Sequence, residues 1–174
     1  MKQIMLLLLI VLMPTAALAQ HAHGAQIVPK ETGQDAFAAI SEIVSQLQAD
    51  PATDWSTISI DALRAHLVDM NRVTLMSDVQ SIRSETMIAF NVTGQGKTVS
   101  SIQRMTTAHA PMLAAQTGWT IRAIPTDHGA TLQISAADKG QLQKIAGLGF
   151  FGVMTIGAHH QAHHMMIAMG HNPH

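Results

Sequence analysis

The feature that most constrains the fold is the repeated order of extended and helical segments in the second half of the chain. Residues 73–82 and 86–92 are rich in β-branched and apolar side chains that alternate with a period near two, which predicts a pair of strands. Residues 119–124 and 131–135 show the same pattern and predict a second pair. A segment with helical character follows each pair. We therefore expect two strand-strand-helix units that form one antiparallel sheet, with the helices packed on one face.

Two amphipathic helices are predicted before this sheet. The first covers residues 35–48, is capped by Asp35 and ends before Asp50-Pro51. The second begins at Ser59 or Asp61. Each carries an apolar stripe at helical spacing: Phe37, Ile40, Ile43, Val44 and Leu47 in the first, and Ile60, Leu63, Leu67 and Met70 in the second. Because these stripes must be buried against other elements, the predicted fold class is α+β, with N-terminal helices followed by the antiparallel sheet.

The helix after the first strand pair is predicted over residues 98–115. Pro111 lies inside it, and proline lacks the amide hydrogen that an interior helical residue donates, so we expect a kink or an early stop near Ala110. In the second strand pair, Asp127-His128-Gly129 predicts a hairpin turn. His128 is therefore expected to be an exposed turn residue outside any site.

The helix after the second strand pair is predicted to begin within residues 137–144, where Asp138 favours the first helical turn. The next fourteen residues, 145–158, are uncharged and include four glycines. Each glycine disfavours a helix by about 1 kcal/mol relative to alanine. We expect either close packing of this segment on a neighbour or a break near residues 147–152. The segment is too short to span a bilayer, which requires about 20 residues.

Directly after this apolar segment comes the sequence His159-His160-Gln161-Ala162-His163-His164-Met165, in which four of the eleven histidines occupy six consecutive positions. On a helix, residues four apart share one face, so His159 pairs with His163 and His160 with His164. Neutral imidazole is the commonest metal ligand, and such pairs can chelate one ion. A solvated polar helix end is the alternative interpretation. We favour metal binding, because a ligand segment anchored by an apolar helix is better preorganised than a loose tail.

Two other predicted helices carry an imidazole and a thioether four residues apart. His66 pairs with Met70, and Met105 pairs with His109. A core methionine beside a surface histidine explains either pair taken alone. Similar pairs on three helices suggest one shared site, whose predicted ligands are His66, Met70, Met105, His109, His159, His160, His163 and His164. This ligand set suits copper, with Cu(I) favouring Met and Cu(II) favouring His, and zinc is the alternative through the histidines.

Composition argues against several other classes of function. The net charge is −1 and 12% of the residues are charged, so no basic patch indicates a nucleic acid partner. With four Phe, two Trp and no Tyr, the chain has few rings on which bases could stack. The absence of Cys excludes disulfides, thiolate metal sites and Cys nucleophiles.

The amino terminus has the pattern of a secretory signal peptide over residues 1–19. Lys2 supplies the positive charge, residues 4–13 form an unbroken apolar run, and Ala17-Leu18-Ala19 matches a cleavage site. The apolar run is too short to span a bilayer comfortably. We therefore expect a periplasmic or secreted protein that starts at Gln20 and has no membrane span after cleavage.

The mature chain is expected to contain one domain. Residues 20–33 lack any period and predict a flexible arm, in which His21 and His23 could catch a metal ion. Residues 34–170 are predicted to form a single globular domain that ends in the His-rich helix, and residues 171–174 form a tail.

The predicted function is that of an exported protein that binds and handles copper through His and Met side chains. One alternative is a zinc-dependent hydrolase. It is disfavoured because the H-E-x-x-H and G-x-S-x-G motifs are absent and no acidic residue accompanies the histidine cluster, although Asp69 lies near His66. The other alternative is an envelope protein that binds a protein partner, or a second copy of itself, through residues 145–158 and uses its histidines as a pH switch.

The signal-peptide prediction has a direct test. Cleavage after Ala19 should give a mature protein that begins with Gln20, because the small residues Ala17 and Ala19 occupy the positions that signal peptidase requires. Mass analysis of the amino terminus of the exported protein checks this. Retention of Met1 would contradict the prediction.

Overall fold

In the computed structural model, the residues described are 36–157 and 159–171, without the side chains of residues 159–161. They belong to one compact unit, Thr32–His174. The predicted signal peptide and arm, residues 1–33, and the tail residues 172–174 lie outside the described residues.

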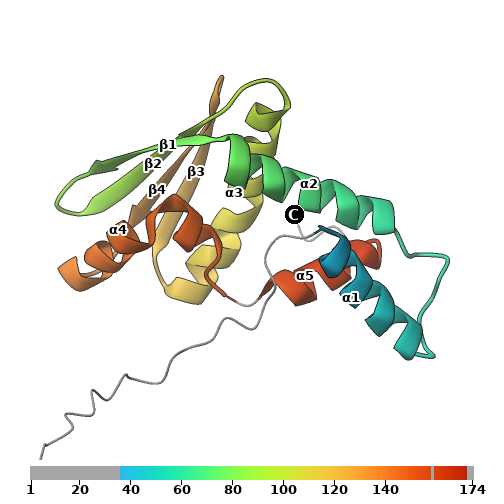
Figure 1. Ribbon diagram of the computed structural model, residues 1–174. Coiled ribbons are helices and arrows are strands. Elements are labelled where there is room, and N and C mark those ends of the chain that lie inside the picture. Colours follow the sequence, from blue (N-terminus) through green and yellow to red (C-terminus); the bar gives the residue numbers. More distant parts are fainter. Residues whose placement is uncertain (1–35, 158, 172–174) are drawn as a thin grey trace, which may run out of the picture. The chain divides into compact units, whose positions relative to one another are not determined.

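The described chain contains five helices and four strands (Figure 1). The helices are α1 (Ala36–Ala49), α2 (Ile60–Met76), α3 (Lys97–Thr117), α4 (Lys139–Met154) and α5 (His159–Ala168). The strands are β1 (Asp78–Arg83), β2 (Met87–Thr93), β3 (Thr120–Thr126) and β4 (Gly129–Ser135). The α+β fold class and the order of two strand-strand-helix units are confirmed.

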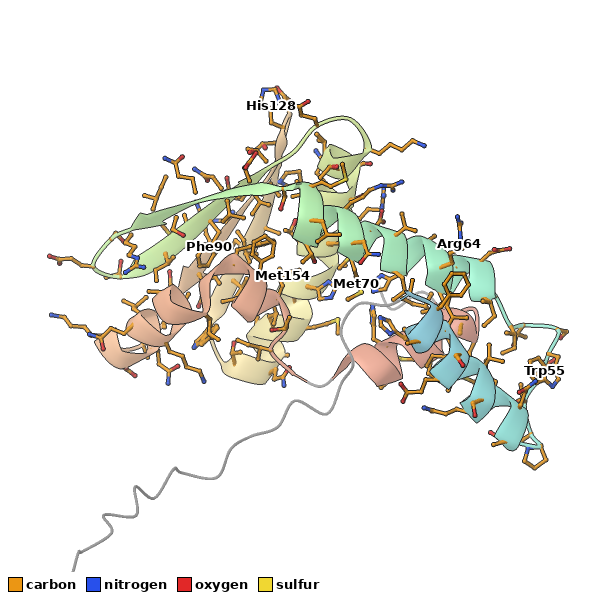
Figure 2. All side chains as sticks on the ribbon, in the orientation of Figure 1. Trp55, Arg64, Met70, Phe90, His128 and Met154 are labelled. Atoms are coloured by element: carbon orange, nitrogen blue, oxygen red, sulfur yellow. The ribbon has the colours of Figure 1, made fainter. Side chains whose placement is uncertain are left out.

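The four strands form one antiparallel sheet in the order β1-β2-β4-β3. Each strand pair is a hairpin, and the two hairpins join through β2 and β4, where Phe90 lies opposite Leu132. The two predicted units therefore contribute equally to one sheet. Asp127 and His128 form the turn between β3 and β4, as predicted, and Figure 2 shows His128 at the tip of that hairpin.

Helices α3 and α4 cover one face of the sheet. The central strands alternate along their length, with every second residue buried toward these helices: Ile88, Phe90, Val92, Ala130, Leu132 and Ile134. Phe90 meets Phe150 of α4 at a ring-centroid distance of 6.3 Å. On the opposite face the Thr131 hydroxyl donates to the Asn91 side-chain oxygen at 2.9 Å. The prediction that the helices pack on one face is confirmed for α3 and α4.

A second hydrophobic cluster lies among α1, α2 and α5. Its buried members are Ile43, Leu47, Leu63, Leu67, Ile167 and Ala168. Helix α2 belongs to both clusters, because Leu63 and Leu67 pack in the second whereas Val73 packs in the first, beneath the sheet. Met70 contacts both clusters. The helix thus joins the sheet-bearing half of the unit to the all-helical half (Figure 1).

The first predicted strand began too early. Residues 73–76 are the last turn of α2, and β1 starts at Asp78. Val73 is three residues after Met70 and continues the buried stripe of the helix, with 4% of its surface exposed. The β-branched composition of this stretch was therefore outweighed by tertiary packing, as often happens for strand propensity.

The early stop predicted at Pro111 is wrong, because α3 continues to Thr117. Proline removes one helical hydrogen bond, the one that an amide at position 111 would donate to the Thr107 carbonyl. Thr107 is exposed, so water can satisfy that carbonyl oxygen. Ala110 and Leu113 are buried on either side of the proline, and their packing in the core holds the helix together across it.

The break predicted within residues 147–152 is present. Gly149 has φ +63° and ψ −175°, which is not helical, and α4 changes direction there. A positive φ is a conformation that glycine adopts more readily than any other residue. Helix α4 then ends at Met154, so the histidine-rich segment forms a separate helix, α5. Within the described residues no helix is both long enough and apolar enough to cross a membrane.

The attachment of α5 can be tested at Gly170, which has φ +80°. A Cβ atom there would lie 2.7 Å from the carbonyl oxygen of Thr57. Gly118 is the control, because its φ is +70° and a Cβ would meet nothing within 4 Å. Gly118→Ala should lower the free energy of unfolding by about 1–2 kcal/mol through backbone strain alone.

Gly170→Ala should cost more than Gly118→Ala, because α5 must also move away from Thr57. Urea unfolding of the two variants and the parent measures this difference. Equal costs would show that the end of α5 is not held against Thr57.

Candidate metal site at the helix junction

Four histidines from three helices meet where the two hydrophobic clusters adjoin. His66 comes from α2, His109 from α3, and His163 and His164 from α5. The His66 ring centroid lies 4.8 Å from that of His163, 5.5 Å from that of His164 and 6.4 Å from that of His109. The His109 and His163 centroids are 5.8 Å apart. Histidines separated by almost a hundred residues in sequence are thus neighbours in space.

Three of the four histidines are buried, because they lie on helix faces that pack into the protein, whereas His66 is partly exposed. On α5 the buried residues are His163, His164, Ile167 and Ala168, which repeat at three- and four-residue spacing. His163, His164 and His109 have 3%, 5% and 8% of their surface exposed. Polar rings are seldom so deeply buried without a specific role or partner. His163 and His164 therefore occupy the face of α5 that packs into the protein.

The spacing of the rings is close to that of a shared ion. Two imidazoles that bind one tetrahedral ion have centroids roughly 5 Å apart, because each metal–nitrogen bond is about 2.0 Å long. Nevertheless, no group of three or more His, Cys, Asp or Glu residues in the described part of the chain is already arranged to hold a metal ion. The rings are neighbours, and side-chain rotation is needed before three of them can share one ion.

The tautomer of His109 is set by its own helix. Its Nδ1 lies 2.8 Å from the carbonyl oxygen of Met105. A carbonyl oxygen can only accept, so Nδ1 carries the proton and donates it, and the lone pair of the neutral ring is on Nε2. A hydrogen bond from one ring nitrogen to a carbonyl is the usual way in which proteins orient a metal-binding histidine.

The two thioethers predicted as ligands are placed differently. Met105 is buried in the core beneath the sheet and also lines an open cleft of about 350 Å³, together with His66, Asp69, Arg104 and His171. Met70 packs between the two hydrophobic clusters, and Figure 2 labels it on α2. Both therefore lie on the helices that carry His66 and His109, and their role as ligands stays a prediction.

Two other methionines, which the sequence analysis did not select, border the histidines. Met112 and Met154 line a small, partly open cavity of about 10 Å³ together with His109 and His163. Met112 follows His109 by three residues, so its position on the same helical face was recoverable from the sequence. Met154 is the last residue of α4, and only the tertiary structure brings it to α3 and α5.

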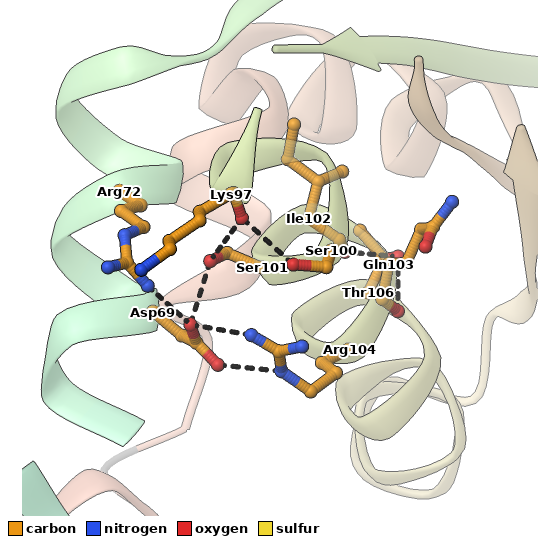
Figure 3. Close-up of polar contacts among 9 residues, drawn as sticks. All are labelled: Asp69, Arg72, Lys97, Ser100, Ser101, Ile102, Gln103, Arg104 and Thr106. Atoms are coloured by element: carbon orange, nitrogen blue, oxygen red, sulfur yellow. Dashed lines mark hydrogen bonds and ion pairs between the residues drawn. The ribbon is translucent and has the colours of Figure 1, made fainter. Parts of the chain in front are cut away.

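A polar network fixes α2 against α3 beside the cleft (Figure 3). The Arg104 guanidinium donates to both carboxylate oxygens of Asp69, at 2.8 and 2.9 Å, and the Ser101 hydroxyl donates to Asp69 at 2.7 Å. Arg72 adds an ion pair at 3.5 Å. Burial by itself raises the pKa of Asp69, but the hydrogen bonds from Arg104 and Ser101 and the positive charges of Arg104 and Arg72 outweigh it, so this pKa lies below the ordinary value.

The side chains of the remaining predicted ligands lie outside the residues that the structure describes. The backbone of His159 and His160 belongs to the first turn of α5, but their side chains lie outside the described residues, as do His21 and His23. Comparison of the chain with protein-family models, with functionally described proteins and with solved structures gives no match. The function must therefore be argued from the residues at the helix junction.

The ion pair between Asp69 and Arg104 should make a pH-dependent contribution to the free energy of unfolding. A carboxyl group with a lower pKa in the folded than in the unfolded state adds stability that is fully present above the unfolded pKa, about 3.9, and is lost as the pH falls through the folded pKa. Asp69→Asn should lower the free energy of unfolding by about 1–2 kcal/mol near neutral pH, since the Arg104 side chain is more than half exposed.

Urea unfolding of the parent and the Asp69→Asn variant, from about pH 3 to about pH 7, measures this contribution. The difference between them should shrink below about pH 4. A difference that stays constant over the whole range would contradict the proposed role of the Asp69 charge.

Proposed function

We propose that this protein is an exported metal-binding protein that handles copper at the junction of α2, α3 and α5. The observation that carries the proposal is the meeting of four imidazole rings from three helices, each of which has its centroid within 6.4 Å of at least two of the others. Its ligands are drawn from His66, His109, His163 and His164. The sequence-based candidates His159 and His160, at the start of α5, and the thioethers of Met70 and Met105 belong to the same proposal.

The chemistry of the donors supports copper over other ions. Imidazole binds Cu(II) more tightly than Zn(II) or Ni(II) in the general order of divalent affinities. Thioethers near the rings add soft donors that suit Cu(I). Zinc stays the alternative ion, because the imidazoles alone satisfy its preferences.

The cleft supports access of an ion to the site. It has a volume of about 350 Å³, and its lining includes His66 and the exposed His171. An ion in this cleft is therefore next to one imidazole of the helix junction.

A hydrolytic enzyme is less well supported than a binding protein. A catalytic zinc site needs a carboxylate that can act as a base for the metal-bound water. Asp69 is the acidic residue that lines the cleft with His66, but Arg104 and Ser101 hold its oxygens and its pKa is lowered. A carboxylate held in this way is a poor proton acceptor. We therefore propose binding without turnover.

The metal site is tested by a double variant of α5. His163→Asn with His164→Asn should weaken Cu(II) binding by well over tenfold, or by more than about 1.4 kcal/mol, because two of the four imidazoles are lost. His128→Asn is the matched control, since His128 lies in the exposed hairpin turn, and it should bind as the parent does. Calorimetric titration measures the affinities, and thermal melts confirm that each variant is folded.

A second double variant separates the two halves of the histidine motif. His159→Asn with His160→Asn should weaken binding only if the first turn of α5 also supplies ligands. Parent-like Cu(II) binding by the His163/His164 variant would refute a site at the helix junction.

A further inference from the structure

The helix junction, where the four histidines meet, is bordered by two cavities whose lining residues differ in charge. The open cleft on one side is lined by charged residues, among them Asp69 and Arg104. The other side is the small, partly open cavity of about 10 Å³ beside α3, α4 and α5. A cavity of that size holds about one water-sized particle. It is therefore suited to a single ion and too small for an organic ligand.

Building on the proposed metal-binding function, we propose that this small cavity binds a soft monovalent cation, Cu(I). Its ligands are the imidazoles of His109 and His163 and the thioethers of Met112 and Met154. The cation is held between three helices, with two donors from α3 and one each from α4 and α5.

The position of each donor follows from its element. His109 and Met112 are three residues apart on α3, so their side chains lie on the same face of that helix. Met154 ends α4 and has 9% of its surface exposed, and His163 lies on the buried stripe of α5 with 3% exposed. The Nδ1 of His109 donates to the Met105 carbonyl, which assigns Nε2 as the metal-binding nitrogen of that ring.

This site needs fewer imidazoles than a histidine-only site. Three imidazoles in the described part of the chain do not already converge on one point. Two imidazoles and two thioethers make a donor set of four that does not require a third imidazole, and all four residues line this one cavity. The cavity thus offers a route to metal binding that the arrangement of the histidines alone does not provide.

Charge decides which oxidation state this cavity prefers. Its lining contains no Asp, Glu, Lys or Arg, and consists of His109, Met112, Leu113, Gln116, Met154, Ile156, Gly157 and His163. No carboxylate there compensates the charge of a buried cation. The cost of transferring an ion from water rises with the square of its charge, so a divalent ion is about four times as costly as a monovalent one. Neutral thioether ligands also favour Cu(I).

A core-filling role for the methionines is the competing explanation. Met154 is part of the hydrophobic cluster beneath the sheet, and methionine often fills gaps in a core. Leucine has nearly the same volume and is apolar, but it has no sulfur. Replacement by leucine therefore removes the ligand and keeps the packing.

The experiment compares ion affinities of the full mature chain and its variants. Ag(I) is used as an air-stable soft monovalent ion, and Cu(I) is supplied as its acetonitrile complex without oxygen. Met112→Leu with Met154→Leu should weaken binding of both ions at least tenfold and leave Cu(II) and Zn(II) affinities unchanged. Met166→Leu with Met169→Leu is the control, since Met166 on α5 and Met169 directly after α5 are each 39% exposed, and it should bind all four ions as the parent does.

Two results would overturn the inference. One is parent-like Ag(I) and Cu(I) affinity in a folded Met112/Met154 variant. The other is loss of Cu(I) affinity in Met70→Leu with Met105→Leu but not in the Met112/Met154 variant, which would assign the soft donors to the cleft side. In both cases retained Cu(II) binding that depends on His163 and His164 would leave the proposed function standing. A parent protein that binds none of the four ions would refute both proposals.

Discussion

Helix α2 packs into two hydrophobic clusters at once, and the arrangement of the other elements depends on this. Leu63 and Leu67 bury its first half against α1 and α5, whereas Val73 buries its last turn beneath the sheet. His66 lies between Leu63 and Leu67 in the sequence and one turn before Met70, which contacts both clusters. The first histidine of the helix junction is therefore one helical turn from the place where the two clusters meet.

Polar contacts then fix the other helices relative to α2. The bonds of Asp69 to Arg104 and Ser101 hold α3 alongside it. Helix α5 is attached near its end, where the Ser59 amide donates to the Ala168 carbonyl at 2.6 Å. A hydrogen bond is directional, so these contacts define how the helices are aligned, whereas hydrophobic burial mainly brings them together. The closeness of the imidazole rings follows from both.

The two sides of the junction differ because charged residues line only one of the two cavities. Asp69 and Arg104 line the open cleft, where water can solvate an ion of any charge. The small cavity is lined by imidazoles, thioethers, apolar groups and the amide of Gln116, with no Asp, Glu, Lys or Arg. Under the proposed function, an arriving ion would first meet the charged residues of the open cleft. A bound ion would be surrounded by the imidazoles and thioethers of the small cavity. This difference in dielectric environment and ligand type is what a copper-handling protein would use to distinguish oxidation states.

The sequence by itself determined the α+β class, the two hairpins and the glycine break, because side-chain periodicity and turn residues act locally. It did not determine the end of α2 at Met76 or the passage of α3 through Pro111, since burial in the sheet core outweighs local propensity at both places. For the site, four-residue spacing pointed to histidines on three helices. Only the tertiary structure brought their rings together and placed Met154 beside His109, because packing between helices distant in the sequence decides which side chains become neighbours.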